Sequence, residues 1–433
     1  MLDRTQDEIS RLVEPGRVHR RVYTDSDLFE LEMERIFGRA WLFVGHASQV
    51  PKPGDYITTE LGRQPVIMVR HHDGSVRVLL NRCTHRGAKV VNERCGHAPR
   101  LTCLYHGWTF DTDGTLVGVP VPEGCAADFR KEEFGLARAP RVGEYRGFVF
   151  ASLAASGPSF EDHIGPMKGN IDDLVDRAPD GTLAFDAGMH RYVYNGNWKL
   201  QIENVLDSYH VPFGHASTVN KQGGQFARRE GDQKGAKVVE GDQTRTASTW
   251  KDRRSYIVGN GHGWTSNTAL DEGKRSSPAF DEYKRVLIEK VGAARAEQIL
   301  TPRLHNSLIY PNMSIMGLNI HVRVIKPIAV DRTEVNIYPV RLVGAPAAMN
   351  FGNIRLLNVT HSAASFVQTD DLEAFARAQK GLRSHGTDWV DISRGLGAEE
   401  PDRERNATRG LATHEMVVRA QYKAWAGYMH EAL

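Results

Sequence analysis

Hydrophobic and polar residues alternate in several short runs of the chain, and a period of two predicts half-buried β-strands. PVIMVR (65–70) and VRVLLN (76–81) flank HHDGS, while WTF (108–110) and TLVGV (115–119) flank DTDG. Asp-Gly between alternating runs is a hairpin signal, so this part of the chain is expected to be a small antiparallel β domain. Residues 308–344 alternate over a longer stretch and predict a second set of successive antiparallel strands.

A spacing of three and four residues predicts helices near both ends of the chain. In 25–41, DSDLFELEMERIFGRAW places Leu28, Leu31, Ile36 and Phe37 at helical spacing, with Asp25 or Ser26 as the cap. From His414 onward, the predicted inward positions of an amphipathic helix are Val417, Ala420, Ala424 and Tyr428. Between these ends, residues 217–285 are polar and rich in Gly, Lys and Arg, and we expect long loops that cover the mouth of a pocket.

Two proline- and glycine-containing stretches suggest domain boundaries. The first is VPKPGDY near residue 50, and the second is ASLAASGPS near residue 155. We therefore predict an N-terminal helical segment (1–40) that packs on the last domain, a β domain (41–155) and a larger C-terminal domain (156–433).

Composition excludes several classes of partner. The chain has 55 Lys and Arg against 53 Asp and Glu, so its net charge does not indicate nucleic acid or an anionic membrane as a partner. No apolar run is long enough to span a bilayer, and MLDRTQDEIS lacks the pattern of a signal peptide, which predicts a cytoplasmic protein. Four cysteines in 433 residues are too few for a disulfide framework.

The cysteines fall within one short part of the chain, which in a reducing compartment indicates a metal site. NRCTHRGAKV holds Cys83 and His85, and LTCLYHGWTF holds Cys103 and His106. Common zinc patterns pair cysteine with cysteine and histidine with histidine, whereas each loop here offers one of each. This arrangement matches a Rieske [2Fe-2S] cluster, in which one iron takes both sulfurs and the other both nitrogens.

Glycines near both histidines support the cluster interpretation. Gly87 and Gly107 lie where each loop must turn and bring backbone N–H groups near the bridging sulfides. Cys95 and Cys125 lie outside the motif and are expected to be ordinary thiols.

A second group of candidate ligands lies in ENVLDSYHVPFGH, at 203–215. Two histidines five residues apart occur often by chance, but Asp207 and His210 would share one face of a helix, where the carboxylate reaches the imidazole. Pro212 is expected to end or kink that helix and so let His215 approach His210. The spacing is compatible with one metal site.

The two motifs, in this order, resemble the large α subunit of the Rieske non-heme iron aromatic ring-hydroxylating oxygenases, and the resemblance covers essentially the whole chain. It implies an α+β fold in which an all-β Rieske domain precedes a catalytic domain of helices and an antiparallel sheet. It also implies a mononuclear Fe(II) bound by His210, His215 and a carboxylate of the C-terminal part, with open positions for dioxygen.

For that carboxylate, SFVQTDDLEAFARAQKGL offers Asp370 and Asp371 at the expected start of a helix, after a strand-like run. Capping is their alternative role, since carboxylates there satisfy free N–H groups. The family's pattern favours Asp371, with Asp370 as the second choice. In the family, the aspartate matching Asp207 links an iron histidine, here His210, to a cluster histidine of the neighbouring subunit, here His106. A ring-like oligomer follows, an α3 or α3β3 assembly.

The resemblance also implies the reaction, which is addition of both atoms of dioxygen to an aromatic ring to give a cis-dihydrodiol. Among the family, the chain looks closer to the benzoate, anthranilate and cumate type oxygenases, which favours an aromatic carboxylate as substrate. The expected pocket residues flank the ligands; they are Asn204, Val205, Leu206, Phe366 and Val367. Packing in the core is the alternative role for the four apolar ones.

GNGHGW at 259 fails the G-x-G-x-x-G pattern, so NAD(P)H is expected to act only through a separate reductase, with or without a ferredoxin. Rival interpretations are a Rieske monooxygenase or demethylase, a pure electron carrier, and a zinc-stabilised binding protein. The second metal motif, which follows the β domain, argues against an electron carrier.

Overall fold

A computed structural model describes residues 6–215, 253–266, 277–300, 306–317 and 319–430. By its internal contacts the chain divides into two compact units. The first contains the described parts of 1–32, 164–183 and 187–432, and the second contains 33–163 and 184–186. Among the described residues, no helix is both long and apolar enough to cross a bilayer.

The unit of residues 33–163 is built from three antiparallel sheets. Their strands are β3 (Leu42–His46), β4 (Asp55–Leu61), β5 (Gln64–Arg70), β6 (Val76–Leu80), β7 (Cys95–His97), β8 (Arg100–Thr102), β9 (Thr109–Asp111), β10 (Leu116–Gly118), β11 (Arg141–Tyr145) and β12 (Phe148–Ser152). The two predicted hairpins are confirmed, because β5 pairs with β6 and β9 with β10. The four-stranded sheet has the order β6-β5-β4-β7.

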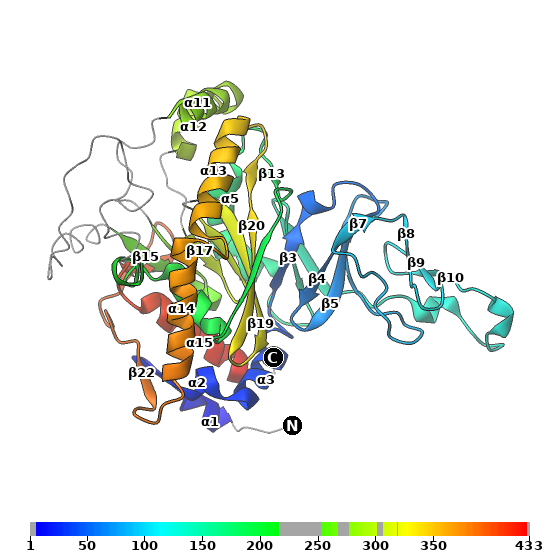
Figure 1. The fold of residues 1–433 in the computed structure, drawn as a ribbon, viewed down its shortest axis with the longest axis horizontal. Coiled ribbons are helices and arrows are strands. Elements are labelled where there is room, and N and C mark those ends of the chain that lie inside the picture. Colours follow the sequence, from blue (N-terminus) through cyan, green and yellow to red (C-terminus); the bar gives the residue numbers. More distant parts are fainter. Residues whose placement is uncertain (1–5, 216–252, 267–276, 301–305, 318, 431–433) are drawn as a thin grey trace. The chain divides into compact units, whose positions relative to one another are not determined.

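The larger unit is organised around a nine-stranded sheet of order β14-β20-β19-β18-β17-β16-β15-β24-β23 (Figure 1). Its strands are β14 (His190–Tyr194), β15 (Arg254–Ile257), β16 (Gly263–Thr265), β17 (Asn306–Ile309), β18 (Met313–Met316), β19 (His321–Ala329), β20 (Arg332–Pro339), β23 (Glu400–Asp402) and β24 (Ala407–Leu411). All neighbours are antiparallel, which confirms the set of strands predicted for 308–344. The expected α+β fold is therefore confirmed.

Several helices of this unit accompany the large sheet. The α-helices that lie wholly within the unit are α1 (Gln6–Ser10), α2 (Arg21–Thr24), α5 (Lys168–Val175), α6 (Trp198–Leu206), α7 (Val211–Gly214), α11 (Pro278–Val291), α12 (Ala293–Leu300), α13 (Ala347–Thr360), α14 (Phe366–Gly381) and α15 (Met416–His430). Figure 1 shows α13 and α14 running along the sheet. Four shorter strands are β1 (Val13–Glu14), β2 (Arg17–His19), β21 (Arg341–Leu342) and β22 (Trp389–Asp391). Three further elements each contain a boundary between the two units; they are α3 (Ser26–Arg35), α4 (Phe160–Ile164) and β13 (Leu183–Ala184).

One face of the large sheet carries α6. A Cβ added at Gly263 of β16 would lie 3.4 Å from Cδ1 of Leu206, and Thr265, on the same face of β16, donates to the carbonyl of Leu206. The opposite face meets α5. Leu308 of β17 pairs with Gly263 and so points to the face of α6, which means that Ser307, the residue before it, points to the other face. Asn170 of α5 donates to the hydroxyl of Ser307.

Parts of the helix and loop predictions are wrong. Residues 253–266 and 278–285 are not loops, since they form β15 and β16 of the sheet and the start of α11; the rest of the predicted loop region lies largely outside the described residues. The C-terminal helix exists, but its buried face is rotated. Gln421, Tyr422 and Trp425 are buried, whereas Ala424 and Tyr428 are half-buried. Gln421 is tolerated inside because its amide donates to the carbonyl of Ile202.

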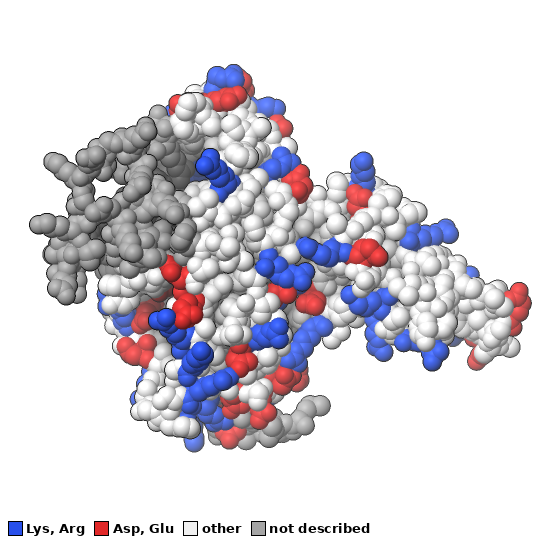
Figure 2. Space-filling model, in the orientation of Figure 1, with Lys and Arg blue, Asp and Glu red and all other residues white. Residues whose placement is uncertain are grey.

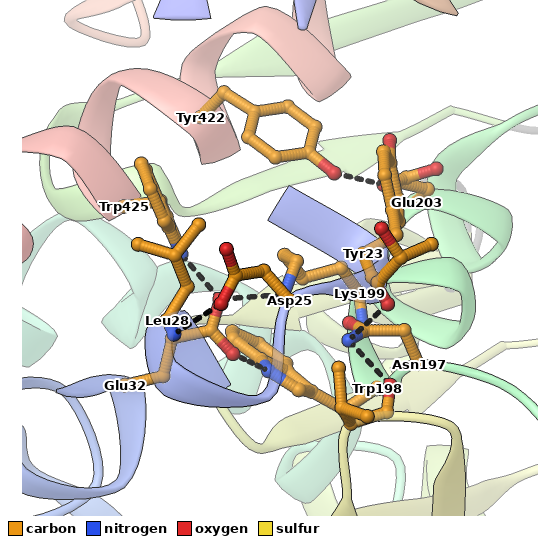
Figure 3. A network of polar contacts seen from close by, with 12 residues as sticks. Tyr23, Asp25, Leu28, Glu32, Asn197, Trp198, Lys199, Glu203, Tyr422 and Trp425 are labelled. Carbon is orange, nitrogen blue, oxygen red and sulfur yellow. Dashed lines mark hydrogen bonds and ion pairs between the residues drawn. The ribbon is translucent and has the colours of Figure 1, made fainter. Parts of the chain in front are cut away.

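The predicted N-terminal helix is confirmed as α3, and Asp25 is its cap, because its carboxylate accepts from the N–H groups of Asp27 and Leu28. Glu32 of α3 is fully buried (Figure 3). Its carboxylate accepts from Lys199 Nζ at 2.5 Å, and also from the indole nitrogens of Trp198 and Trp425. Removing either charge of a buried, hydrogen-bonded pair costs about 3–5 kcal/mol, so this network fixes α6 against α3 and α15.

Charge is spread rather than concentrated. Figure 2 shows basic and acidic side chains interspersed over the visible face of the described surface, as the near balance of 55 and 53 such residues suggests.

Candidate functional site

The two cysteine and histidine loops have the same backbone hydrogen bonds. In the first, the N–H of Cys83 donates to the carbonyl of Ala88 at 2.8 Å, and Gly87 donates back to the carbonyl of Cys83 at 2.9 Å. In the second, Cys103 donates to Trp108 at 2.8 Å and Gly107 donates to Cys103 at 2.9 Å. Both loops are therefore tight turns of one design, the second of them closing the hairpin of β8 and β9.

Glycine is required at both turns. Gly87 has φ +78° and Gly107 has φ +70°, a left-handed conformation that costs a residue with a Cβ about 1–2 kcal/mol. At Gly107 a Cβ would also lie 2.8 Å from Cγ of Pro120, whereas at Gly87 the nearest atom is Nε of the flexible Arg82 at 3.4 Å.

The loops bring the four predicted cluster ligands together. Both thiols are buried and lie in hydrogen-bonding contact. Burial raises the pKa of the Cys83 thiol, and Cys103 beside it adds to the effect, so binding a metal here must release protons. The imidazoles of His85 and His106 lie 4.6 Å apart, and His85 stacks on Trp108 at 4.7 Å. Two thiols and two imidazoles on facing loops fit a [2Fe-2S] cluster.

The second candidate site begins where α6 ends. The prediction that Asp207 and His210 share a helix is wrong, because α6 ends at Leu206 and Asp207 has extended backbone angles (φ −82°, ψ 114°). Pro212 does not break this helix either; it lies in the first turn of α7, where its missing N–H is not needed. His210 and His215 are consequently held by a turn and by the end of a short helix.

Three side chains converge there. Asp371 Oδ1 lies 3.6 Å from His210 Nε2 and 3.3 Å from His215 Nε2, and the two imidazole rings are 5.2 Å apart. All three donor atoms lie within 4.8 Å of one another. Two imidazole nitrogens and one carboxylate at this separation suit a divalent first-row metal, and the three residue types match the facial triad of non-heme iron enzymes.

A carboxylate lies behind each histidine. Asp207 Oδ2 is 3.1 Å from His210 Nδ1, and Asp370 Oδ2 is 3.5 Å from His215 Nδ1. Such partners fix the ring orientation and leave Nε2 for a metal. The geometry therefore gives the adjacent aspartates different positions, with Asp371 among the converging donors and Asp370 outside them.

The alternative role of these aspartates, capping of the helix, is wrong. The predicted strand-like run belongs to α14, whose N-cap is Ser365; its hydroxyl accepts from the N–H of Gln368 at 3.3 Å. Asp370 and Asp371 lie in the second turn of the helix, beyond its free N–H groups.

The site is charged even without a metal. Burial alone would raise the pKa of Asp371, but the neighbouring imidazoles of His215 and His210 outweigh it, and the pKa lies below its ordinary value. Burial lowers the pKa of His215, yet the contacts with Asp371 and Asp370 raise it above the ordinary value. Asp371 thus stays ionised and suits a cation.

Comparison with known proteins decides the family. Residues 40–130 match the model of the Rieske [2Fe-2S] domain, and residues 184–431 match that of the ring hydroxylating alpha subunit (catalytic domain). The chain is 34% identical to the 2-halobenzoate 1,2-dioxygenase large subunit of Burkholderia cepacia, over 92% of this chain and 84% of that one. It is also 34% identical to the anthranilate 1,2-dioxygenase large subunit of Acinetobacter baylyi, over 88% and 80% of the two chains.

The chain belongs to the Rieske ring-hydroxylating dioxygenases, as an α subunit. A solved naphthalene 1,2-dioxygenase with indole bound in its active site is 25% identical and has a TM-score of 0.81, covering 97% of this chain and 94% of that one. The resemblance seen in the sequence is confirmed. This dioxygenase is an oxidoreductase whose cofactors are a Rieske [2Fe-2S] cluster and a catalytic non-heme iron, for which His210, His215 and Asp371 supply a fitting site.

The predicted pocket residues of the dioxygenase have different surroundings. Asn204 lies among the converging donors, its Nδ2 at 3.2 Å from His210 Nε2 and 3.1 Å from Asp371 Oδ1. Val205 and Leu206 are buried, and Leu206 faces the sheet at Gly263. Val367 is half-buried in the first turn of α14, and the side chain of Phe366 lies outside the described residues.

Several buried polar residues near the site were missed by the sequence analysis. Gln368 lies one turn before Asp371 on α14 and is fully buried, and among the described residues neither of its amide atoms has a hydrogen-bond partner. Arg323 and His321 are buried on β19. A signal was present, because IHVRVIK places these two polar residues at alternate positions of an apolar strand, on the same face as Ile325.

Proposed function

We propose that this α subunit dihydroxylates an aromatic carboxylate to a cis-dihydrodiol, with Cys83, His85, Cys103 and His106 holding the cluster and His210, His215 and Asp371 holding the iron. The observation that carries the proposal is the convergence of the three donor atoms within 4.8 Å. In the reaction two C–O bonds form on the ring and the O–O bond breaks, with two electrons and two protons supplied from outside.

The side chains around the iron site orient the groups that would bind the iron. When bound, the cluster supplies electrons one at a time and the iron supplies the activation of dioxygen. Asp207 accepts the Nδ1 proton of His210, so this ring presents Nε2, and the carboxylate of Asp370 lies 3.5 Å from His215 Nδ1. Asn204 donates a hydrogen bond of 3.1 Å to Asp371 Oδ1, the oxygen that faces both histidines.

Two observations support a carboxylate as part of the substrate. The relatives named above are a 2-halobenzoate and an anthranilate dioxygenase, and both names describe aromatic carboxylates. The buried Gln368 amide, one helical turn before Asp371, has no hydrogen-bond partner among the described residues, and a bare hydrocarbon would leave it unsatisfied.

We further propose that a separate reductase, with or without a ferredoxin, supplies the electrons and that the protein acts as an α3 or α3β3 oligomer in the cytoplasm. Relatives named as a large subunit or as subunit alpha support a multisubunit system. In that oligomer Asp207, which bonds His210 here, would also meet His106 of the neighbouring subunit. The proposed domains are 41–155 for the cluster and 156–433 for the iron, with 1–40 packing on the latter. The contacts of Tyr23 and Glu32 with Glu203 and Lys199 support that packing.

The experiment that tests this function is turnover of benzoate by the holoenzyme with a suitable reductase under ¹⁸O₂. We expect a diol that contains two labelled atoms from one molecule of oxygen, and loss of product in His210→Ala and His215→Ala. A hydroxybenzoate that carries a single labelled oxygen would instead identify a monooxygenase reaction.

A further inference from the structure

A continuous row of residues crosses the face of the large sheet that carries α6. The strand registers pair Gly263 with Leu308, Leu308 with Ser314, Ser314 with Arg323, Arg323 with Ile337, and Ile337 with His190. Directly paired residues of an antiparallel sheet point to the same face. Because Gly263 faces Leu206 of α6, Arg323 points to the face of the sheet that α6 covers.

Arg323 is a buried charge without a counterion in the described part of the chain. It is 1% exposed, its Nε donates to His321 Nε2 at 3.1 Å, and no described carboxylate forms an ion pair with it. Burying an unpaired guanidinium is costly, and proteins retain such a group where a ligand supplies the negative charge.

The surroundings of Arg323 suit an anion better than a neutral group. Its partner across the strands, Ser314, is fully buried, and Ser314 Oγ has no hydrogen-bond partner among the described residues. A guanidinium fork and a hydroxyl side by side can together satisfy both oxygens of a carboxylate. His321 cannot replace the anion, because burial, followed by the charge of Arg323, lowers its pKa and keeps it neutral.

The same face of the sheet also meets the helix that carries Asp371. Tyr192 and Tyr194 lie at alternate positions from His190 on β14 and so point to this face. The hydroxyl of Tyr192 donates to Gln201 of α6, and the ring of Tyr194 packs on Phe375 of α14 at 5.1 Å. A benzoate held at the sheet by its carboxylate would therefore extend its ring toward the converging donors.

We propose that Arg323, assisted by Ser314, binds the carboxylate of the aromatic substrate and selects for it. This inference rests on the proposed function, since it names the residues that would recognise the carboxylate of the proposed substrate.

The test compares benzoate with benzamide, a neutral molecule of nearly the same shape, in the holoenzyme. For wild type and Arg323→Met, the dissociation constant of each compound is measured anaerobically and kcat/KM is measured with a reductase. We expect the preference for benzoate over benzamide to fall by about 30-fold or more in Arg323→Met, because a buried charge pair is lost. Arg323→Lys keeps the charge without the fork and should lose less, and Ser314→Ala should lose the least.

Arg191→Met is the matched control. Arg191 lies on β14 of the same sheet, but it follows His190 and so points to the opposite face, where its side chain is 50% exposed. Its benzoate preference should equal that of the wild type. If Arg323→Met does not fold, Arg323→Lys and Ser314→Ala still test the proposal, because the preference for benzoate should fall more in the first than in the second.

The outcomes separate the two proposals. A wild type that selects benzoate while Arg323→Met, Arg323→Lys and Ser314→Ala keep the same preference would overturn the role of Arg323 and leave the proposed function intact. A wild type that prefers benzamide, or binds only uncharged aromatics, would overturn the carboxylate substrate and the role of Arg323 together.

Discussion

In the cluster loops, backbone hydrogen bonds within short segments hold the ligands, whereas in the iron site side-chain carboxylates from separate elements do so. Each cluster loop closes on itself through its cysteine and a left-handed glycine. His210 and His215 instead depend on Asp207 at the end of α6 and on Asp370 of α14. The difference teaches that the cluster site is encoded locally, while the iron site exists only when α6, α7 and α14 are packed together.

The largest effect is expected from exchanging the adjacent aspartates of α14, one at a time, for alanine. Asp371→Ala removes a carboxylate from the converging donors and should abolish turnover along with bound mononuclear iron. Asp370→Ala removes the carboxylate that lies 3.5 Å from His215 Nδ1 and should weaken iron binding or activity by about 10- to 100-fold. Iron content and turnover of both variants check this. The assignment fails if Asp370→Ala loses the iron and Asp371→Ala keeps it.

A second comparison uses the two glycines of the cluster loops. Gly107→Ala should lose most of the cluster, because its Cβ would meet Pro120 at 2.8 Å in addition to the strain of a positive φ. Gly87→Ala has the strain alone and should keep more cluster, since Arg82 can move aside. Acid-labile sulfide per chain measures both, while the mononuclear iron should be retained. Equal sulfide in the two variants would show that the contact with Pro120 is unimportant.

The smallest effect is expected on stability, from Glu203 of α6, whose buried carboxyl group contacts Tyr23 and Tyr422. Burial raises its pKa to about 7, although the hydroxyls of Tyr422 and Tyr23 both donate to it (Figure 3). The folded protein keeps this proton up to about pH 7, and the unfolded chain only up to its ordinary value of 4.5, so stability falls as pH rises between them.

In Glu203→Gln that part of the pH dependence should vanish. The free energy of unfolding of the wild type should then fall by about 2–3 kcal/mol more than that of the variant between pH 5 and pH 8. Denaturant unfolding at both pH values measures the difference. Parallel curves for the two proteins would mean that Glu203 is ionised in the fold throughout this range.

The same contrast explains what the sequence could predict. Local spacing was enough to propose the cluster ligands, because Cys83 and His85 lie two residues apart and Cys103 and His106 three, each pair beside a glycine. The alternating strands were predicted for the same reason, since their pattern is also local. His210, His215 and Asp371 required the resemblance to a family, because nothing local joins α7 to α14. Local rules also misplaced the end of α6 and the cap of α14, where Ser365 takes the role expected of the aspartates.

Arg323 shows the remaining limit. Its strand was predicted, but the residues around a buried charge decide what it does. Ser314 lies beside Arg323 only because of the sheet register, which no local pattern in the sequence predicts.

The most direct test of two metal centres in one chain is an EPR spectrum of the anaerobically purified protein before and after dithionite, with iron and acid-labile sulfide assayed on the same sample. The account predicts a signal of low average g that appears on reduction, with about three irons and two sulfides per chain. Zinc without sulfide, or two irons with no third after reconstitution with ferrous iron, would contradict it.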